Sequence, residues 1–339
     1  IGPSCPVQYL AAADRIGLPV NVGLFAAHNE IRRRWREDHY AAISEEILDK
    51  MAEALNDQLA AGCIGVSFGL RYVPGTSRRE LQALAAVAAR CKKMVSAHAR
   101  DDAAFVPAAF QELIDTAAQQ QVRMQISHIG SMAAFGQMEE VLAMVDRACL
   151  SGLAIGMDCY PYTAFCTAIG SATYDAGFLA RYGIGYDALE ITGGTYRGQR
   201  CTEAMFQEVR ASHPEILAVA HVMRAAEIDR ALSHPRVAMA SDGILVDGFG
   251  HPRAAGSFPH FIAEYVRNKK ILTLHEAISK MTALPAEYTG IAKGTLTVGA
   301  DADVTVFDPA TVEGSASFAD PLQHPRGIEW VVIGGKAAV

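Results

Sequence analysis

Residues 238–259 read AMASDGILVDGFGHPRAAGSFP, and they place a carboxylate at the end of a buried strand. The apolar run from Val237 to Ala240 has the length of such a strand, and Ser241-Asp242-Gly243 ends it with turn residues. In folds of alternating parallel strands and helices, catalytic groups lie where the strands finish. Asp242 is therefore a candidate general base or metal ligand, with a plain Asp-Gly turn as the alternative. His251-Pro252-Arg253 follows in a loop rich in Gly and Pro, a type of segment that often carries function.

Apolar runs recur along the chain, and each ends in polar or aromatic residues before a helical segment begins. The expected strands begin near Leu18, Ile64, Met94, Val122, Ala154 and Val237. Expected helices cover residues 106–120 and 137–150, and an earlier helix runs to about Cys91 behind a cap at Thr76 or Ser77. This alternation predicts an α/β fold built of parallel crossover units, a (β/α)8 barrel represented by six of its eight strands.

Two segments depart from this rhythm. Residues 163–216 are rich in Gly and Tyr without a clear period, and we expect an inserted lid over the strand ends. Leu217–Ala220 is a strand-like run too short to count. After an amphipathic helix at 272–281, short β elements and turns begin at about residue 294. We therefore expect a barrel over residues 1–291, with the lid inserted at about 163–216, and a separate small sheet over 292–339.

Composition limits the classes of protein that fit. The chain has 339 residues, half of them hydrophobic, and a net charge of −7 with both signs mixed, which argues against a nucleic-acid partner. It has no apolar run near the roughly 20 residues that span a bilayer, so no membrane partner is expected. Arg32–Arg36 is followed by Glu37 and Asp38, which favours a solvated helix face. Seven cysteines without a Cys-x-x-Cys pair favour a reducing cytosol and a cytoplasmic location.

Two histidines form a second candidate site. His98 and His128 each end one of two successive expected strands, so adjacent strands would bring both imidazoles to one rim. A lone buried histidine is more often a hydrogen-bonded core residue, but two of them beside Asp242 favour a metal site. Neutral imidazole is a good zinc ligand, and a nearby carboxylate suits proton transfer from an attacking water. The set predicts metal-assisted hydrolysis of a small-molecule substrate.

An ordered set of motifs carries a family resemblance. The chain resembles the N-acyl-D-amino-acid deacylases, or D-aminoacylases, of the amidohydrolase superfamily over nearly its whole length. The resemblance implies a TIM-like amidohydrolase barrel, and it makes residues 292–339 the C-terminal part of a β-sandwich. The motifs are Gly69–Pro74, His98–Arg100, Ile126–His128, Asp158–Tyr162, Ala220–Met223, Ser241–Gly243, His251–Arg253, Lys280–Ala286, Gly294–Leu296, Gly299–Asp303 and Val306–Pro309.

The resemblance also implies roles for single residues. His98 and His128 match the histidines that hold a tightly bound zinc, and Asp242 matches the general base, which is also a candidate contact of a second metal. Tyr72 matches the tyrosine that polarises the scissile carbonyl, with a core aromatic as the alternative. Arg253 matches the arginine that binds the substrate α-carboxylate, in agreement with its forked donor geometry. The implied reaction releases a carboxylate and a free D-amino acid.

Two other functions stay open at this point. A cyclic-amide hydrolase of the dihydroorotase or hydantoinase type shares the metal chemistry but needs no arginine in the position of Arg253. A catalytically silent barrel is the other alternative, since the His-x-His pair and the cysteine of the family's first two strands are missing here. Cys5 lacks the surroundings of that cysteine, and we expect the sequence to be part of a longer protein.

Residues near the two histidines depart from the family pattern, and His98–Asp102 has an aspartate where the family usually has a glutamate, which is the smaller change. The family's Ser-His-x-Lys becomes Ser127-His128-Ile129-Gly130, which removes a cation and leaves the substrate preference open. Cys159 occupies a variable position and is expected to be buried and unreactive.

Overall fold

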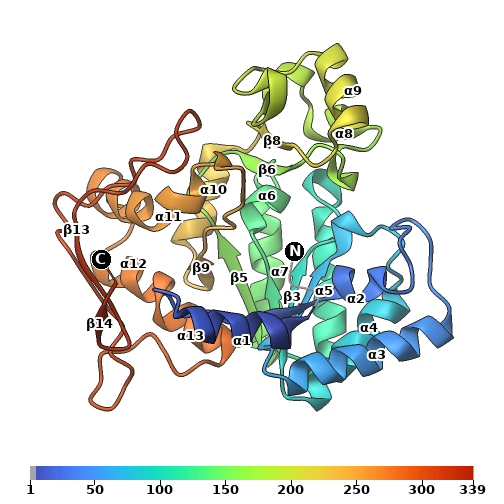
Figure 1. Ribbon diagram of the computed structural model, residues 1–339, viewed down its shortest axis with the longest axis horizontal. Coiled ribbons are helices and arrows are strands. Elements are labelled where there is room, and N and C mark those ends of the chain that lie inside the picture. The colour runs from blue at the N-terminus through green and yellow to red at the C-terminus, as the bar shows by residue number, and fades with distance from the viewer. Residues whose placement is uncertain (1–4, 339) are drawn as a thin grey trace.

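The computed structural model describes residues 5–338 and contains one large parallel sheet (Figure 1). Its six strands follow the order β1-β2-β3-β4-β5-β9, and every neighbouring pair is parallel. The six expected strands are therefore confirmed, in one α/β sheet, although they are shorter than the apolar runs suggested. Their bounds are β1 Phe25–Ala27, β2 Gly65–Gly69, β3 Met94–His98, β4 Met124–Ile126, β5 Ile155–Cys159 and β9 Val237–Met239.

Helices connect successive strands and pack side by side along the sheet. The three helices expected from periodicity are confirmed as α4 (Arg78–Arg90), α5 (Val106–Gln120) and α7 (Met138–Leu150). Ser77 caps α4, because its hydroxyl accepts a hydrogen bond from the Glu80 N–H at 3.0 Å. The helix α3 (Glu45–Ala60) precedes α4 and packs against it.

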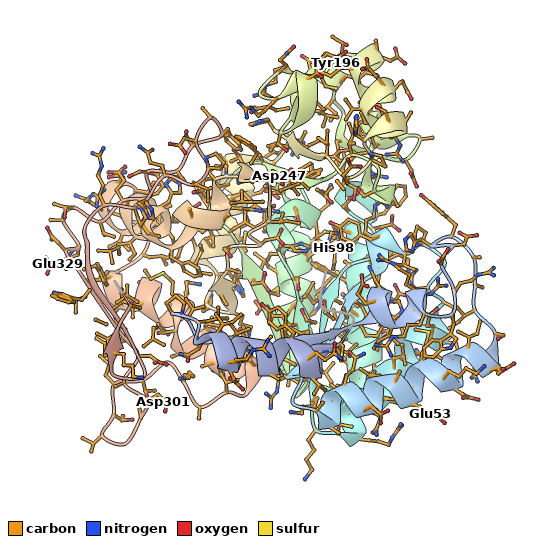
Figure 2. The ribbon with its side chains drawn as sticks, in the orientation of Figure 1. Glu53, His98, Tyr196, Asp247, Asp301 and Glu329 are labelled. Atoms are coloured by element: carbon orange, nitrogen blue, oxygen red, sulfur yellow. The ribbon has the colours of Figure 1, made fainter. Side chains whose placement is uncertain are left out.

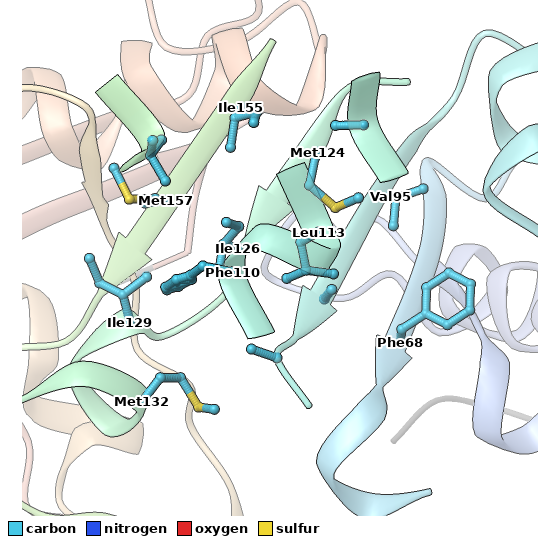
Figure 3. Close-up of a cluster of buried hydrophobic side chains, with 14 of the residues drawn as sticks. Phe68, Val95, Phe110, Leu113, Met124, Ile126, Ile129, Met132, Ile155 and Met157 are labelled. Atoms are coloured by element: carbon cyan, nitrogen blue, oxygen red, sulfur yellow. The ribbon is translucent and has the colours of Figure 1, made fainter. Parts of the chain in front are cut away.

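The main core lies between these helices and the sheet (Figure 3). Phe68, Val95, Met124 and Met157 come from neighbouring strands and Phe110 comes from helix α5, and all are at most 2 % exposed. Burial of one large apolar side chain contributes about 1.5–3 kcal/mol. The core therefore fixes the strands, and with them the groups at the strand ends.

One expected surface helix is partly buried, which corrects the prediction for Arg32–Arg36. Arg32, in α2 (His28–Arg33), is 1 % exposed, whereas residues 33–36 lie at the surface. The Arg32 Nε lies 3.0 Å from Glu80 Oε1, and His28 Nε2 lies 2.7 Å from the same oxygen. A buried carboxylate 48 residues away thus pairs with an arginine that the local charge pattern assigned to solvent.

The segment expected to be a lid has a sheet and a core of its own, seen at the top of Figure 1. Strand β8 (Leu217–Ala220) lies between β6 (Phe165–Ala168) and β7 (Leu189–Ile191), antiparallel to both. The short run at 217–220 is therefore a strand, but of this sheet. We call residues 163–223 the inserted segment. Its two ends meet, since the Met223 N–H donates to the Thr163 carbonyl at 3.1 Å.

A small three-stranded sheet lies apart from the main sheet and from the sheet of the inserted segment. Near the C-terminus, β13 pairs antiparallel with both β12 and β14. Across residues 5–338 we find no helix long and apolar enough to cross a membrane. The bounds not yet given are α1 Pro6–Ile16, α6 Ile129–Ala133, α8 Phe178–Tyr182, α9 Glu203–Ser212, α10 Ala225–Ser233, β10 Leu245–Val246, β11 Phe249–Gly250, α11 Arg253–Phe261, a π-helix Ile262–Asn268, α12 Leu274–Met281, α13 Ala283–Thr289, β12 Val304–Phe307, β13 Ile328–Ile333 and β14 Lys336–Ala337.

Candidate active site

A partly open cavity lies where the parallel strands meet the inserted segment. Figure 2 shows His98 in the middle of the molecule, below the inserted segment that carries Tyr196. Four of the five residues predicted from the sequence line this cavity, and the fifth, Arg253, contacts one of them. The lining residues are Tyr72, His98, Asp102, His128, Ser131, Met132, Phe165, Cys166, Thr167, Thr173, Tyr182 and Asp242.

The two histidines face each other across adjacent strands, as predicted. Their ring centroids are 4.4 Å apart with an edge-on orientation, and the Tyr72 ring lies 4.7 Å from that of His98. Burial holds the pKa of His98 well below its ordinary value, and the neighbouring His128 and Arg71 act in the same direction. His98 is therefore neutral, which is the form that binds a metal.

His128 has a left-handed backbone that a buried carboxylate stabilises. Its φ is 37° and its N–H donates to Asp158 Oδ1 at 2.7 Å, while Asp158 Oδ2 accepts from Gln125 Nε2 at 2.6 Å. Strained backbone of this kind clusters at functional sites. Asp158, at the end of β5, thus fixes the turn that presents His128.

Ser131 sets which nitrogen of His128 is free. The Ser131 hydroxyl donates its one hydrogen to the His128 carbonyl at 2.9 Å, and its oxygen lies 3.0 Å from Nδ1. With the hydroxyl hydrogen assigned to the carbonyl, the oxygen accepts from Nδ1–H, and this assignment leaves the Nε2 lone pair free. Nothing in the spacing of the motifs pointed to Ser131.

The residues present fit part of a zinc site. Within residues 5–338 no hydrogen bond uses the His98 ring, and His128 has a free Nε2, so each offers one nitrogen. No group of three or more His, Cys, Asp or Glu that could hold a metal occurs in that range. His98 and His128 are thus two candidate ligands, and Asp242 lines the same cavity.

Arg253 is buried beside Asp242, and part of its guanidinium group is free to donate to a ligand. Its Nη2 lies 2.9 Å from Asp242 Oδ2 and donates to the Cys166 carbonyl at 3.1 Å. Its Nε and Nη1 are buried without a partner among the described residues, and the guanidinium lies 4.6 Å from the Tyr160 ring centroid. Since unpaired buried donors are costly, these two nitrogens favour a bound anion.

The stretch expected to be a loop around Arg253 is a short hairpin followed by helix α11. His251 makes hydrogen bonds that fix the first residue of this helix. The buried His251 Nδ1 accepts from the Arg253 N–H at 3.0 Å. Its Nε2–H donates to the Ala164 carbonyl at 3.0 Å. This tautomer follows because only a nitrogen without a proton accepts from an N–H. His251 therefore fixes Arg253 relative to the inserted segment.

Tyr72 follows β2 in a single turn of 3₁₀ helix at Leu70–Tyr72. Burial raises the pKa of Tyr72 to about 12, so its hydroxyl keeps its proton and serves as a hydrogen-bond donor. Its place in the cavity lining separates it from an ordinary core aromatic.

Packing explains the glycine that departs from the family pattern. A Cβ atom at Gly130 would lie 2.7 Å from Ile228 Cδ1 and 2.9 Å from Cys159 Sγ. The space is therefore closed to a longer side chain. Cys159 is fully buried, as predicted, and burial raises the pKa of its thiol to about 12, so the thiolate is absent at neutral pH.

Comparison with known proteins identifies the class first. The Amidohydrolase family profile matches residues 199–339. An N-acyl-D-glutamate deacylase of Alcaligenes xylosoxydans xylosoxydans is 32 % identical over 346 residues, covering 97 % of this chain and 69 % of the relative. A D-aminoacylase of the same organism is 28 % identical over 350 residues, with the same two shares. The solved N-acyl-D-glutamate deacylase of Bordetella bronchiseptica, complexed with zinc and a phosphonate inhibitor, has a TM-score of 0.88 at 32 % identity and covers 98 % of this chain and 71 % of its own.

The fold and the comparisons define a hydrolytic enzyme of the amidohydrolase type. Within that class, the chain belongs to the N-acyl-D-amino-acid deacylase family. The resemblance predicted from the ordered motifs is thereby confirmed, and the catalytically silent alternative is set aside.

Proposed function

We propose that this enzyme uses zinc to hydrolyse the linear amide bond of an N-acyl-D-amino acid, releasing a carboxylate and the free D-amino acid. The observation that carries the proposal is the cavity where His98, His128, Tyr72 and Asp242 meet, with the free donors of Arg253 beside them. An α-carboxylate on a linear substrate matches those donors, which favours it over a cyclic amide.

Arg253, Asp242 and Tyr72 would each have a separate role in the reaction. Arg253 would bind the α-carboxylate through Nε and Nη1 and so orient the amide. Asp242 would take the proton of the attacking water and return it to the leaving nitrogen, and the Tyr72 hydroxyl would donate to the oxygen on which negative charge develops. Zinc, held by His98 and His128, supplies a Lewis acid and lowers the pKa of water to about 7 when bound.

The proposal extends to architecture and location. The sheet would form part of a (β/α)8 barrel, residues 292–339 the C-terminal part of a β-sandwich, and the segment at about 163–216 a lid. The TM-score of 0.88 to a family member supports this arrangement. All seven cysteines are free, which favours a cytoplasmic location. The partner would be a small molecule rather than nucleic acid or a membrane.

The test measures metal content and turnover together. Elemental analysis should find about one zinc per chain or more, and chelation should abolish hydrolysis of N-acetyl-D-amino acids. Readdition of zinc should restore it, with the matching L-amino acid derivatives as controls. Zinc-loaded protein that cleaves none of the D-substrates would overturn the proposal.

A further inference from the structure

Among the lining residues that take no part in the proposed chemistry, four combine an aromatic surface with polar groups. Phe165 comes from β6, Thr173 from a 3₁₀ turn at 172–174 and Tyr182 from the end of α8, so three belong to the inserted segment. The fourth, Asp102, also lines the cavity. It follows His98 by four residues and lies outside the inserted segment. We call these four residues the selection wall.

The Asp102 carboxylate lines the cavity, whereas Arg181, the cation paired with it, is not among the lining residues. Tyr182 donates its hydroxyl to Asp102 Oδ2 at 2.6 Å, and Arg181 Nε lies 2.9 Å from Asp102 Oδ1. The Arg181 guanidinium also donates to the Thr173 carbonyl and lies 4.9 Å from the Tyr182 ring centroid. Arg181 is thus already paired with Asp102, and it is not among the residues that line the cavity.

Thr173 leaves a hydroxyl without a partner. The residue is 5 % exposed, and its Oγ1 is buried with no hydrogen bond among the described residues. A buried hydroxyl in this state is costly unless a ligand atom pairs with it. The wall therefore offers one free hydroxyl next to one carboxylate.

No cation lines the cavity to receive a second acidic group. Within the described residues that form its lining, Asp102 and Asp242 carry the carboxylates, and none is Lys or Arg. The free donors of Arg253 are committed to the α-carboxylate in the proposed function. A substrate with an acidic side chain would therefore face the Asp102 carboxylate and find no unpaired cation in the lining, because Arg181 is already paired with Asp102, and this costs binding energy.

We propose that the selection wall chooses an uncharged side chain with hydrogen-bond donors, so that a carboxamide is preferred over the carboxylate of the same shape. The amide N–H groups would donate to Asp102, and the amide oxygen would accept from the Thr173 hydroxyl. Phe165 and the Tyr182 ring would cover the methylene groups. This proposal rests on the proposed function and names the substrate class within it, one that differs from the acidic substrate in the name of one relative.

The test compares two substrates of equal size on the zinc-loaded enzyme. N-acetyl-D-glutamine should have a kcat/KM at least about tenfold above that of N-acetyl-D-glutamate, because juxtaposed like charges cost more than the 1.4 kcal/mol that a factor of ten requires. Asp102→Asn should raise kcat/KM for the glutamate substrate and narrow this ratio. Zinc content and circular dichroism would verify that the variant folds.

The neighbouring aspartate provides a matched control. Asp101 pairs with Arg71 at 2.9 Å and does not line the cavity, so Asp101→Asn should leave the ratio unchanged. If Asp102→Asn fails to fold, Thr173→Val serves as the second variant, and it should lower kcat/KM for the glutamine substrate more than for N-acetyl-D-leucine.

The possible outcomes separate the two proposals. A glutamate substrate that is cleaved as well as or better than glutamine would overturn the selection wall while the deacylase function stands. Equal effects of Asp101→Asn and Asp102→Asn on the ratio would also overturn it. If zinc-loaded enzyme cleaves no N-acyl-D-amino acid, the proposed function fails first, and the selection wall with it.

Discussion

The cavity is bounded by two regions that differ in how they are held. His98 and His128 lie at the ends of parallel strands whose side chains belong to the main core. Thr173 and Tyr182 lie on the inserted segment, which has a second core of its own around residues such as Phe206. The difference teaches that most of the groups proposed for substrate choice rest on a second core, while Asp102 and the groups proposed for the chemistry rest on the first, so substitutions in the inserted segment should affect substrate choice more than turnover.

The largest expected effect is on the sheet side. His98→Ala should lose both zinc and turnover, because Lewis-acid stabilisation of several kcal/mol corresponds to a rate loss of about 10³-fold or more. Zinc analysis and kcat/KM with an N-acetyl-D-amino acid measure this. His213→Ala is the matched control, since that side chain is 62 % exposed and lies on the inserted segment. An active His98→Ala enzyme would remove the basis for the metal site.

Asp242→Asn should separate metal binding from turnover. The zinc content should stay, while kcat falls about 10²–10⁴-fold, the usual range for loss of a general base. Asp247→Asn is a close control, because Asp247 also precedes a glycine, has a positive φ of 52° and lies outside the cavity. Equal losses in both variants would point to backbone strain instead of proton transfer.

Tyr72→Phe should lower kcat by about 10²–10³-fold, the range for loss of one donor to a developing oxyanion, with zinc content unchanged. Because the pKa of Tyr72 is raised to about 12, no loss of activity from its ionisation is expected below about pH 10. A pH–rate profile checks this. Tyr196→Phe, at an exposed hydroxyl bonded to Glu208, should have no effect.

A smaller effect is expected for the serine beside His128. Ser131→Ala removes the hydrogen bond that holds Nδ1, and zinc affinity should fall about 10–100-fold, as for other residues that orient a ligand. Turnover at saturating zinc should change little. Chelator competition measures the affinity, and an unaltered value would show that His128 is oriented by Asp158 alone.

The smallest effect should be confined to the inserted segment. Thr202 caps α9 by accepting from the Met205 N–H at 3.3 Å, so Thr202→Ala should cost about 1 kcal/mol of stability. Urea unfolding would measure the loss, while zinc content should stay the same. A drop in zinc affinity would show that the two cores are coupled.

Much of the parallel sheet, with the candidate residues at its strand ends, could be predicted from the sequence because the patterns that indicate it are local. Several apolar runs are followed closely by a candidate site residue, as with His98 after Met94–Ala97, and parallel strands bring such residues to one rim. Arg32 was misplaced because its partner, Glu80, lies 48 residues away and leaves no mark on the local charge pattern.

The strands of the inserted segment could not be predicted from the sequence, because they leave no local pattern. Its strands have three or four residues and pair with segments far along the chain, as β6 does with β8. Strands β1, β4 and β9 of the main sheet are just as short, but long helices alternate with the main-sheet strands, whereas the inserted segment lacks this alternation. Asp102 and Thr173 consequently gave no signal, because only the fold brings them to one cavity.

The two ends of the inserted segment lie side by side, where the Met223 N–H donates to the Thr163 carbonyl. Because closing a longer loop adds only about 0.6 kcal/mol for each doubling of its length, such a segment is open to growth, shortening or exchange during evolution. The enzyme is in this sense modular, and a graft made between residues 163 and 223 would carry a new preference onto unchanged catalytic strands.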